Sequence, residues 1–352
     1  MTVARVWVAM SGGVDSSVAA ALLVESGHEV TGVTMQLLPS GDEEGECCFG
    51  SATRDARQVC DDLGIAHHTL DFRDSFERHV IGPFADAYAQ GRTPNPCIAC
   101  NDQLKFSDLM AGVIAQGAEF LATGHYARIV RDATGSTWLA RGTDPDKDQS
   151  YFLYRLTRIQ MDRILFPVGG LGKQEVRARA ARFGLRTAER SESQDTCFAS
   201  SGGYAPIVAA RRPRALVPGE FVTQTGDVIG SHRGLAHYTI GQRRGLDIGG
   251  PDGPWFVVSM DPASNRIVVG HRDSVSARTI IAAQPVWSGA ASEVCTAQVR
   301  YRMTPAAATA RYAGDSLTVN FGDDVGAAAP GQSVVCYRGD RVLGGGVIEC
   351  AS

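Results

Sequence analysis

The sequence predicts an α/β protein: a mostly parallel sheet in the N-terminal part, followed by two small β-rich domains. In the first half, short β-rich runs alternate with helical patterns, which is typical of a parallel sheet covered by helices on both faces. After about residue 205 the pattern changes to short strands separated by Gly, Pro and Asn/Asp turns, which favours small antiparallel barrels. The length of 352 residues exceeds one typical core and also predicts more than one domain.

The individual elements follow from the spacing of apolar residues. A run at residues 3–9 that is apolar except for Arg5 predicts a buried strand, and a glycine turn separates it from a helix over about residues 14–25. Further strands are expected at residues 30–35, 67–70 and 120–123, and further helices at about 53–63 and 173–183. Later strands are expected at 256–260, 266–269, 334–337 and 342–348. The predicted domains are residues 1–205, 206–275 and 276–352.

Composition limits the possible function classes. The 34 basic and 38 acidic residues give a net charge of -4, which by itself argues against a protein that coats a polyanion. The sequence contains no run of 18 apolar residues and no N-terminal secretory pattern, so we expect no membrane span and a cytoplasmic location. Nine cysteines in such a chain are expected to be reduced core residues, metal ligands or reactive thiols.

The strongest local motif is the Ser-Gly-Gly-Val-Asp-Ser sequence at residues 11–16, between the first strand and the first helix. Glycines let the backbone approach an anion closely, and the helix directs its N-terminal amides and positive dipole end toward the same place. A Walker-type loop is absent, because the one Gly-Lys pair ends at Lys173 and lacks the required upstream glycine. The loop resembles the PP-loop of ATP pyrophosphatases, which implies ATP cleavage between the α and β phosphates, with Mg²⁺.

Three cysteines lie in polar motifs. Cys97 and Cys100 are two residues apart in the proline-stiffened sequence Thr-Pro-Asn-Pro-Cys-Ile-Ala-Cys-Asn, and Cys197 lies in a polar loop after a cationic helix. A thiol near Arg or Lys, or at a helix N-terminus, has its thiolate form favoured and can act as a nucleophile or metal ligand. Taken alone, Cys-x-x-Cys is a weak signal. A structural role, as a buried pair or as half of a zinc site, is then about as compatible with it as a reactive one.

Together these motifs resemble the bacterial tRNA-specific 2-thiouridylases, members of the PP-loop superfamily that replace the C2 oxygen of the wobble uridine with sulfur. The resemblance extends over nearly the whole chain. It rests on residues 11–17, 35, 93–106, 123–127, 147–154, 194–198, 237–243 and 299–302. It implies a tRNA partner and a sulfur donor such as a cysteine desulfurase or a sulfur relay protein.

The resemblance also implies roles for particular residues. Cys197 would carry the persulfide, and Cys100 would be its catalytic partner. The ATP site would be lined by Ala9, Met10, Ser11, Gly12, Gly13, Val14, Asp15, Ser16, Met35 and Gly124. Asn95, Pro96 and Cys97 would face the target base. The tRNA would be contacted by His125, Lys147, Asp148, Gln149, Arg300, Tyr301 and Gln332.

At position 97 the sequence differs from one branch of this family. Where one branch has aspartate, this sequence has Cys97, a possible third soft ligand beside Cys100 and Cys197. The three thiols would suit a 4Fe-4S cluster with one open iron, and the departure favours this reading. The alternative is persulfide transfer at Cys197 with a transient disulfide to Cys100, which leaves Cys97 a bystander.

Two other functions fit parts of the sequence. Another PP-loop adenylating ligase would explain the loop but would leave the three cysteines without a role. A metal-binding RNA-interaction module would explain the cysteines but not the adenylation chemistry. The sequence assigns no role to Cys47 and Cys48, and it identifies neither the sulfur donor, the tRNAs that are chosen nor the oligomeric state.

Overall fold

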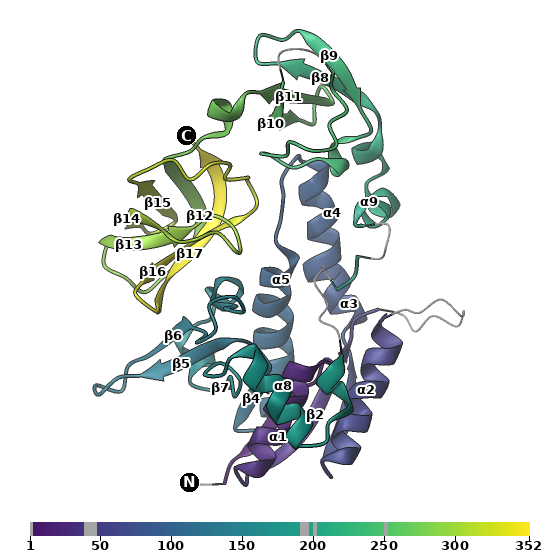
Figure 1. Ribbon diagram of the computed structural model, residues 1–352, viewed down its shortest axis with the longest axis vertical. Helices are drawn as coiled ribbons and strands as arrows, with labels where there is room; N and C mark the ends of the chain where they lie inside the picture. The colour runs from purple at the N-terminus through teal and green to yellow at the C-terminus, as the bar shows by residue number, and fades with distance from the viewer. Residues whose placement is uncertain (1–2, 39–47, 191–196, 200–202, 250–252) are drawn as a thin grey trace. The chain divides into compact units, whose positions relative to one another are not determined.

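The computed structural model describes residues 3–38, 48–190, 197–199, 203–249 and 253–352 (Figure 1). The chain forms two compact units, each of which takes residues from several parts of the sequence. The first unit comprises Met1–His79, Ile98–Gln194 and Asp340–Val342, and the second comprises Val80–Cys97, Asp195–Gly339 and Leu343–Ser352. The division into domains 1–205, 206–275 and 276–352 stays a prediction.

The first unit is built on the predicted parallel sheet. Its strands lie in the order β3-β2-β1-β4-β7, and every neighbouring pair is parallel. The strand bounds are β1 Arg5–Ala9, β2 Glu29–Gln36, β3 Ala66–Asp71, β4 Phe120–Thr123 and β7 Ile164–Leu165. An antiparallel hairpin of β5 (Ala127–Arg131) and β6 (Thr137–Arg141) extends this unit, and Arg341 pairs with Ala140 beside it.

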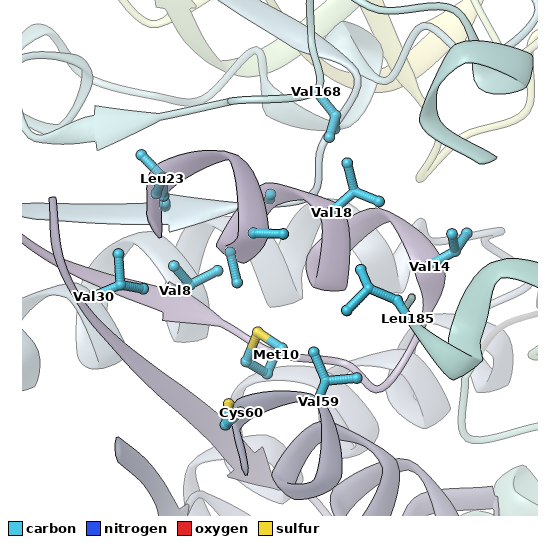
Figure 2. Packing of buried hydrophobic residues seen from close by; sticks show 14 of the residues in the cluster. Val8, Met10, Val14, Val18, Leu23, Val30, Val59, Cys60, Val168 and Leu185 are labelled. Atoms are coloured by element: carbon cyan, nitrogen blue, oxygen red, sulfur yellow. The ribbon is translucent and has the colours of Figure 1, made fainter. Parts of the chain in front are cut away.

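Helices pack on this sheet because their apolar residues face it. The longer ones are α1 Val14–Glu25, α2 Cys48–Asp62 and α8 Lys173–Arg182. Figure 2 shows Val8 and Met10 of the β1 segment with Val14 and Val18 of α1, Val59 and Cys60 of α2, and Leu185, all of which belong to one buried cluster. The shorter helices are α3 Arg73–Phe76, α6 Met110–Ala115, α7 Arg158–Met161, η3 Ser150–Leu153 and η4 Arg186–Glu189.

A long helical region lies between β3 and β4, where the sequence predicts only a proline-stiffened turn and a helix that begins near Lys105 and Phe106. It runs through η1 Glu77–Ile81, α4 Gly82–Ala89, α5 Pro96–Ala99 and the π-helix η2 Cys100–Leu109. The region is hard to see in the sequence because its turns are interrupted by Pro83 and by the Pro-Asn-Pro segment, which break a simple 3.6-residue pattern.

The second unit carries two β structures. Strands β10, β11, β8 and β9 form a sheet around Phe221, Ile267 and Val269, and the pairing of β11 with β8 is parallel, whereas we expected antiparallel strands throughout. Strands β12, β15, β14, β13, β16 and β17 form a barrel that the β12–β17 pairing closes. The bounds are β8 Gly219–Thr223, β9 Val228–His232, β10 Phe256–Asp261, β11 Arg266–Gly270, β12 Thr279–Trp287, β13 Ser292–Gln298, β14 Ala306–Ala313, β15 Ser316–Phe321, β16 Ser333–Arg338 and β17 Arg341–Ala351.

Short helices complete the second unit: α9 Ala205–Arg211, η5 Pro213–Leu216, η6 Leu235–His237 and η7 Arg272–Val275. Among the helices that the structure describes, none combines the length and apolar character needed to cross a bilayer.

Gly124 is a position at which the fold leaves no space for a side chain. A Cβ there would lie 2.6 Å from the Ser16 backbone nitrogen, which is fixed in the first turn of α1. We therefore expect Gly124→Ala to lower the free energy of unfolding by about 1–3 kcal/mol, the usual effect of overpacking. The measurement is the thermal midpoint by scanning calorimetry.

Gly112 on α6 is the matched control, because a Cβ there would have no neighbouring heavy atom within 4 Å. Gly112→Ala should stabilise the chain by up to about 1 kcal/mol through helix propensity. Equal midpoints for the two variants would contradict the close approach at Gly124.

Candidate active site

The strand–loop–helix motif folds so that its own serines hold the loop. The hydroxyls of Ser16 and Ser17 donate to the carbonyl oxygen of Gly13 at 3.1 and 2.8 Å, and the Ser11 amide donates to the Ser16 hydroxyl at 3.2 Å. Gly13 has extended backbone angles as the N-cap of α1, and no side chain caps the helix there. The N-terminal amides of α1 are therefore directed at the loop, as an anion site requires.

The turn needs glycine at position 12. Its φ is +71°, and a Cβ there would lie 2.4 Å from the carbonyl oxygen of Ala52 on α2. A side chain would be both strained and blocked by backbone, so the loop can approach α2 this closely only because Gly12 has no Cβ.

The other residues predicted for the nucleotide site lie at the same edge of the sheet. Ala9 ends β1 and pairs with Val33 of β2 and Thr123 of β4, so Met10, Met35 and Gly124 all lie near the carboxyl ends of neighbouring parallel strands. Ligands of open α/β sheets bind at this edge. Contact of these residues with a nucleotide stays a prediction.

Asp15 is held by two residues that the sequence analysis did not place in the site. The Lys173 ammonium donates to both carboxylate oxygens at 2.7 and 2.9 Å, and the Tyr126 hydroxyl donates to Oδ1 at 2.6 Å. Lys173 also lies over the Tyr126 ring, 5.5 Å from its centroid. The two partners come from the start of α8 and from the connection between β4 and β5.

Arg190 supports the loop from another direction. One guanidinium nitrogen donates to the Gly12 carbonyl oxygen at 2.9 Å and also pairs with Asp55 of α2. Arg177 of α8 in turn donates to the carbonyl oxygens of Ala188 and Arg190 at 2.8 and 3.3 Å. The cationic helix noted in the sequence thus helps to position an arginine that contacts the loop.

The thiols of the Cys-x-x-Cys motif have different environments. Cys97 lies exposed on α5, where its amide donates to Asn95 Oδ1 at 3.2 Å, whereas Cys100 begins η2 and is buried. Burial raises the pKa of the Cys100 thiol, and the nearby Lys105 ammonium acts in the opposite direction. Lys105 donates to Asn101 Oδ1 at 3.0 Å.

Cys197 is exposed, and its neighbour Phe198 packs edge-on against Phe84 of α4 with ring centroids 5.3 Å apart. The residues before Cys197, 191–196, lie outside the described residues, as do the predicted thiol at Cys47 and the side chain of Cys48. In the part of the chain that the structure describes, no three Cys, His, Asp or Glu side chains are gathered to hold a metal ion. A cluster held by Cys97, Cys100 and Cys197 stays a prediction, since these thiols belong to two separate units.

Several residues for which the resemblance implies tRNA contact form packing contacts or hydrogen bonds within the protein. His125 packs against Phe106 and Phe166, and its Nδ1 lies 2.7 Å from the Thr123 hydroxyl. Burial and Lys105 lower the pKa of His125 well below its usual value, so the ring is neutral at pH 7. A neutral histidine could contact a base or sugar but would not neutralise a phosphate.

Asp148 and Gln149 hold the loop between β6 and η3. Asp148 is buried and accepts hydrogen bonds from the backbone amides of Gly142 and Ser150 and from Arg141. Gln149 Oε1 accepts from the Tyr126 amide at 3.0 Å. These two side chains thus support the loop that presents Lys147, and their contact with tRNA stays a prediction.

The predicted tRNA residues of the second unit lie on its barrel. Gln332 donates to the Thr93 carbonyl oxygen at 2.8 Å, which ties the segment before Asn95 and Pro96 to this barrel. Arg300 donates to the Ala327 carbonyl oxygen at 3.3 Å, and the Arg302 guanidinium lies over the Tyr301 ring.

Three family models match successive parts of the chain. They are described as the tRNA methyl transferase HUP domain at residues 4–201, the tRNA methyl transferase PRC-barrel domain at 208–271 and the Aminomethyltransferase beta-barrel domain at 277–348. The tRNA-specific 2-thiouridylase MnmA of Rhizorhabdus wittichii is 48% identical over 350 residues, which cover 98% of this chain and 92% of that protein. The chain belongs to the tRNA-specific 2-thiouridylase family.

Further comparisons agree with this membership. The tRNA-specific 2-thiouridylase MnmA of Geobacter metallireducens is 45% identical over 358 residues, covering 99% of this chain and 97% of the relative. A solved structure of the U34-tRNA thiolase NcsA from Methanococcus maripaludis with its 4Fe-4S cluster is 15% identical, covers 60% of this chain and 66% of its own, and has a TM-score of 0.36. A likeness of that size bears on neither function nor cofactor.

The burial difference between the family thiols predicts their order of reaction with an alkylating agent. At pH 8, iodoacetamide should modify the exposed Cys97 and Cys197 at least about 10-fold faster than Cys100, because Cys100 is buried and burial raises its pKa. Peptide mass spectrometry over time measures each rate.

The barrel thiol Cys336, which is fully buried, is the slow internal reference. Because the pKa of Cys100 is raised, its alkylation should still accelerate above the pH range in which ordinary cysteines have already ionised. Equal rates for Cys97 and Cys100 at pH 8 would contradict the burial of Cys100.

Proposed function

We propose that this enzyme thiolates C2 of the wobble uridine of tRNA by adenylating the C2 oxygen with ATP and then delivering sulfur from a persulfide on Cys197. Family membership makes the chain a tRNA-uridine 2-sulfurtransferase of the PP-loop type. The observation that carries the proposal is the loop between β1 and α1, a phosphate cradle without a Walker lysine, in the same chain as the family's reactive thiols.

This loop also bears on whether the reaction is methyl transfer or thiolation. The description of the N-terminal family model mentions methyl transfer, whereas the relatives are named for thiolation. Methyl transfer from a sulfonium donor involves no phosphate leaving group. Residues 11–16, at the N-terminus of α1, form the kind of site that binds a phosphate, which supports an adenylating reaction.

In the first proposed step, the uracil O2 attacks the α-phosphorus of ATP. The bond between the α-phosphorus and the bridging oxygen breaks, pyrophosphate leaves with the electron pair, and the N3 proton passes to solvent. The chain's contribution is electrostatic: amides at the start of α1 face the charge that develops on the phosphates. Adenylation converts a poor leaving oxygen into AMP.

In the second proposed step, the terminal sulfur of the Cys197 persulfide attacks C2, and AMP leaves with the electron pair. The Cys100 thiolate then attacks the Sγ of Cys197, which breaks the S–S bond and leaves the sulfur on C2 as a thiocarbonyl. The resulting disulfide between Cys100 and Cys197 must be reduced by an external thiol before the next cycle. A persulfide donor, such as a cysteine desulfurase or sulfur relay protein, reloads Cys197.

We propose the persulfide route because it needs only Cys100 and Cys197, the two thiols for which the family resemblance implies a catalytic role. The cluster with Cys97 as a third ligand is the alternative. Mg²⁺, which the use of ATP implies, would neutralise phosphate charge. Both oxygens of Asp15, the acidic residue of the loop, already accept hydrogen bonds from Lys173 and one also accepts from Tyr126. Mg²⁺ would then be held mainly by the phosphates and water.

Cys197→Ala should abolish thiolation and keep tRNA-dependent ATP–pyrophosphate exchange, because the thiol acts only after adenylation. Thiolation is measured by mass analysis of the anticodon nucleosides, and exchange by labelled pyrophosphate. Cys350→Ala is the control, since Cys350 is an exposed thiol at the end of β17. Wild-type thiolation by Cys197→Ala would show that the assignment is wrong.

The choice between persulfide and cluster needs a separate measurement. Protein purified without oxygen should contain no stoichiometric iron or acid-labile sulfide and should thiolate tRNA when given a persulfide donor. Cys97→Ser should then keep at least about half of the activity, because Cys97 carries no sulfur on this route. Activity that depends on added iron and disappears together with iron in Cys97→Ser would instead support the cluster.

A further inference from the structure

Lys173 lies where the positive ends of two helices meet. It is the first residue of α8, and its ammonium pairs with Asp15, the second residue of α1. Each helix carries a partial positive charge at its N-terminus, so a cation is electrostatically unfavourable at either end. Stabilisation of the two helices therefore does not by itself explain why a lysine occupies this position.

A second ion pair joins the same two helices at their C-terminal ends. Arg182, the last residue of α8, pairs with Glu25, the last residue of α1, at 2.6 Å. The two helices thus run parallel, with both N-termini at the edge of the sheet where β1 ends. Arg182 lies at the C-terminal end of its helix, where the dipole favours a cation, and Lys173 lies at the opposite end.

The Lys173 side chain is also largely withdrawn from water. It is 11% exposed, compared with 57% for Arg182. Removing an ammonium from water is costly unless hydrogen bonds and charge compensate for it. Asp15 provides that compensation with both oxygens, and Tyr126 fixes the carboxylate with its hydroxyl while its ring lies beneath the ammonium.

We propose that Lys173 belongs to the nucleotide site, where its ammonium faces the phosphates of ATP in place of the lysine that the loop itself lacks. The inference rests on the proposed use of ATP. When pyrophosphate leaves with the electron pair of the broken bond, negative charge accumulates on it, and a fixed cation stabilises that charge. Lys173 transfers no proton in this step. Tyr126 is a positioning residue, which orients Asp15 and thereby the ammonium.

Arg190 does not fill this role, although it is also a cation beside the loop. Its guanidinium is directed to the carbonyl oxygen of Gly12 and to Asp55, both of which are acceptors in the protein. These contacts hold the backbone of the loop. Lys173 differs because its partner Asp15 lies in the first turn of α1, among the amides that face the anion.

The experiment compares Lys173→Met with Arg182→Gln, which removes a cation from the same helix pair at the end remote from the loop. Two ligands are titrated in the absence of tRNA: α,β-methylene-ATP with Mg²⁺, and adenosine, which has no phosphate. Lys173→Met should bind the analogue at least about 10-fold more weakly, the loss expected for one charge-assisted contact, and adenosine within about twofold of wild type. Arg182→Gln should bind both ligands as wild type does.

The adenosine titration separates a phosphate contact from simple damage to the fold. If Lys173→Met binds the analogue as wild type does, or loses both ligands equally, the inference is overturned. Lys173→Arg, which keeps the charge, should recover most of the affinity for the analogue. In tRNA-dependent ATP–pyrophosphate exchange, Lys173→Met should be slower by about 100-fold, as when one donor to a developing charge is removed.

The wild-type protein distinguishes failure of the inference from failure of the proposed function. If wild type binds the analogue and shows no tRNA-dependent exchange, the proposed adenylation is wrong, and the binding ratio alone decides the role of Lys173. If wild type does not bind the analogue, the proposal that the enzyme uses ATP is wrong, and the inference about Lys173 is wrong as well.

Discussion

The first unit depends on a sharp turn from β1 into α1. Gly12 makes it possible, since its φ of +71° and its approach to Ala52 exclude a side chain. Gly124 lets the end of β4 approach the first turn of α1 from the other side. Because both approaches are backbone to backbone, they fix the α1 N-terminus relative to α2 and to the end of β4. The predicted anion site thus depends on close packing at two glycines.

The local parts of the site were predictable from the sequence, and the distant parts were not. The strand–loop–helix arrangement at residues 11–16 was predictable because strand, turn and helix signals follow one another directly in the sequence. Lys173 is separated from Asp15 by 158 residues, and nothing in its own neighbourhood shows that α8 runs parallel to α1. The Gly-Lys pair at that position resembles the end of a Walker motif but lacks the upstream glycine of that motif.

Motif similarity also does not distinguish a residue that contacts a substrate from one that supports it. Asp148 lies in a motif shared with the family, and in the structure it binds the amides of its own loop and Arg141. Gln332 similarly holds the Thr93 carbonyl. The fold class was predictable from the alternation of elements, but the helical region between β3 and β4 was not, because its apolar pattern is broken by prolines and continues as a π-helix.

The net charge of -4 describes the whole chain and does not describe the surroundings of a particular group. Lys105 and Lys173 are partly or largely buried beside particular groups, where each ammonium acts over a few ångströms with little screening. Lys105 illustrates the effect on the thiols: it opposes the rise in the pKa of Cys100 that burial causes. On the proposed persulfide route, burial and the raised pKa would slow attack by Cys100, whereas the exposed Cys197 would be open to loading from outside. This difference between the two thiols would favour the proposed order of steps, with sulfur loading first and release by Cys100 last.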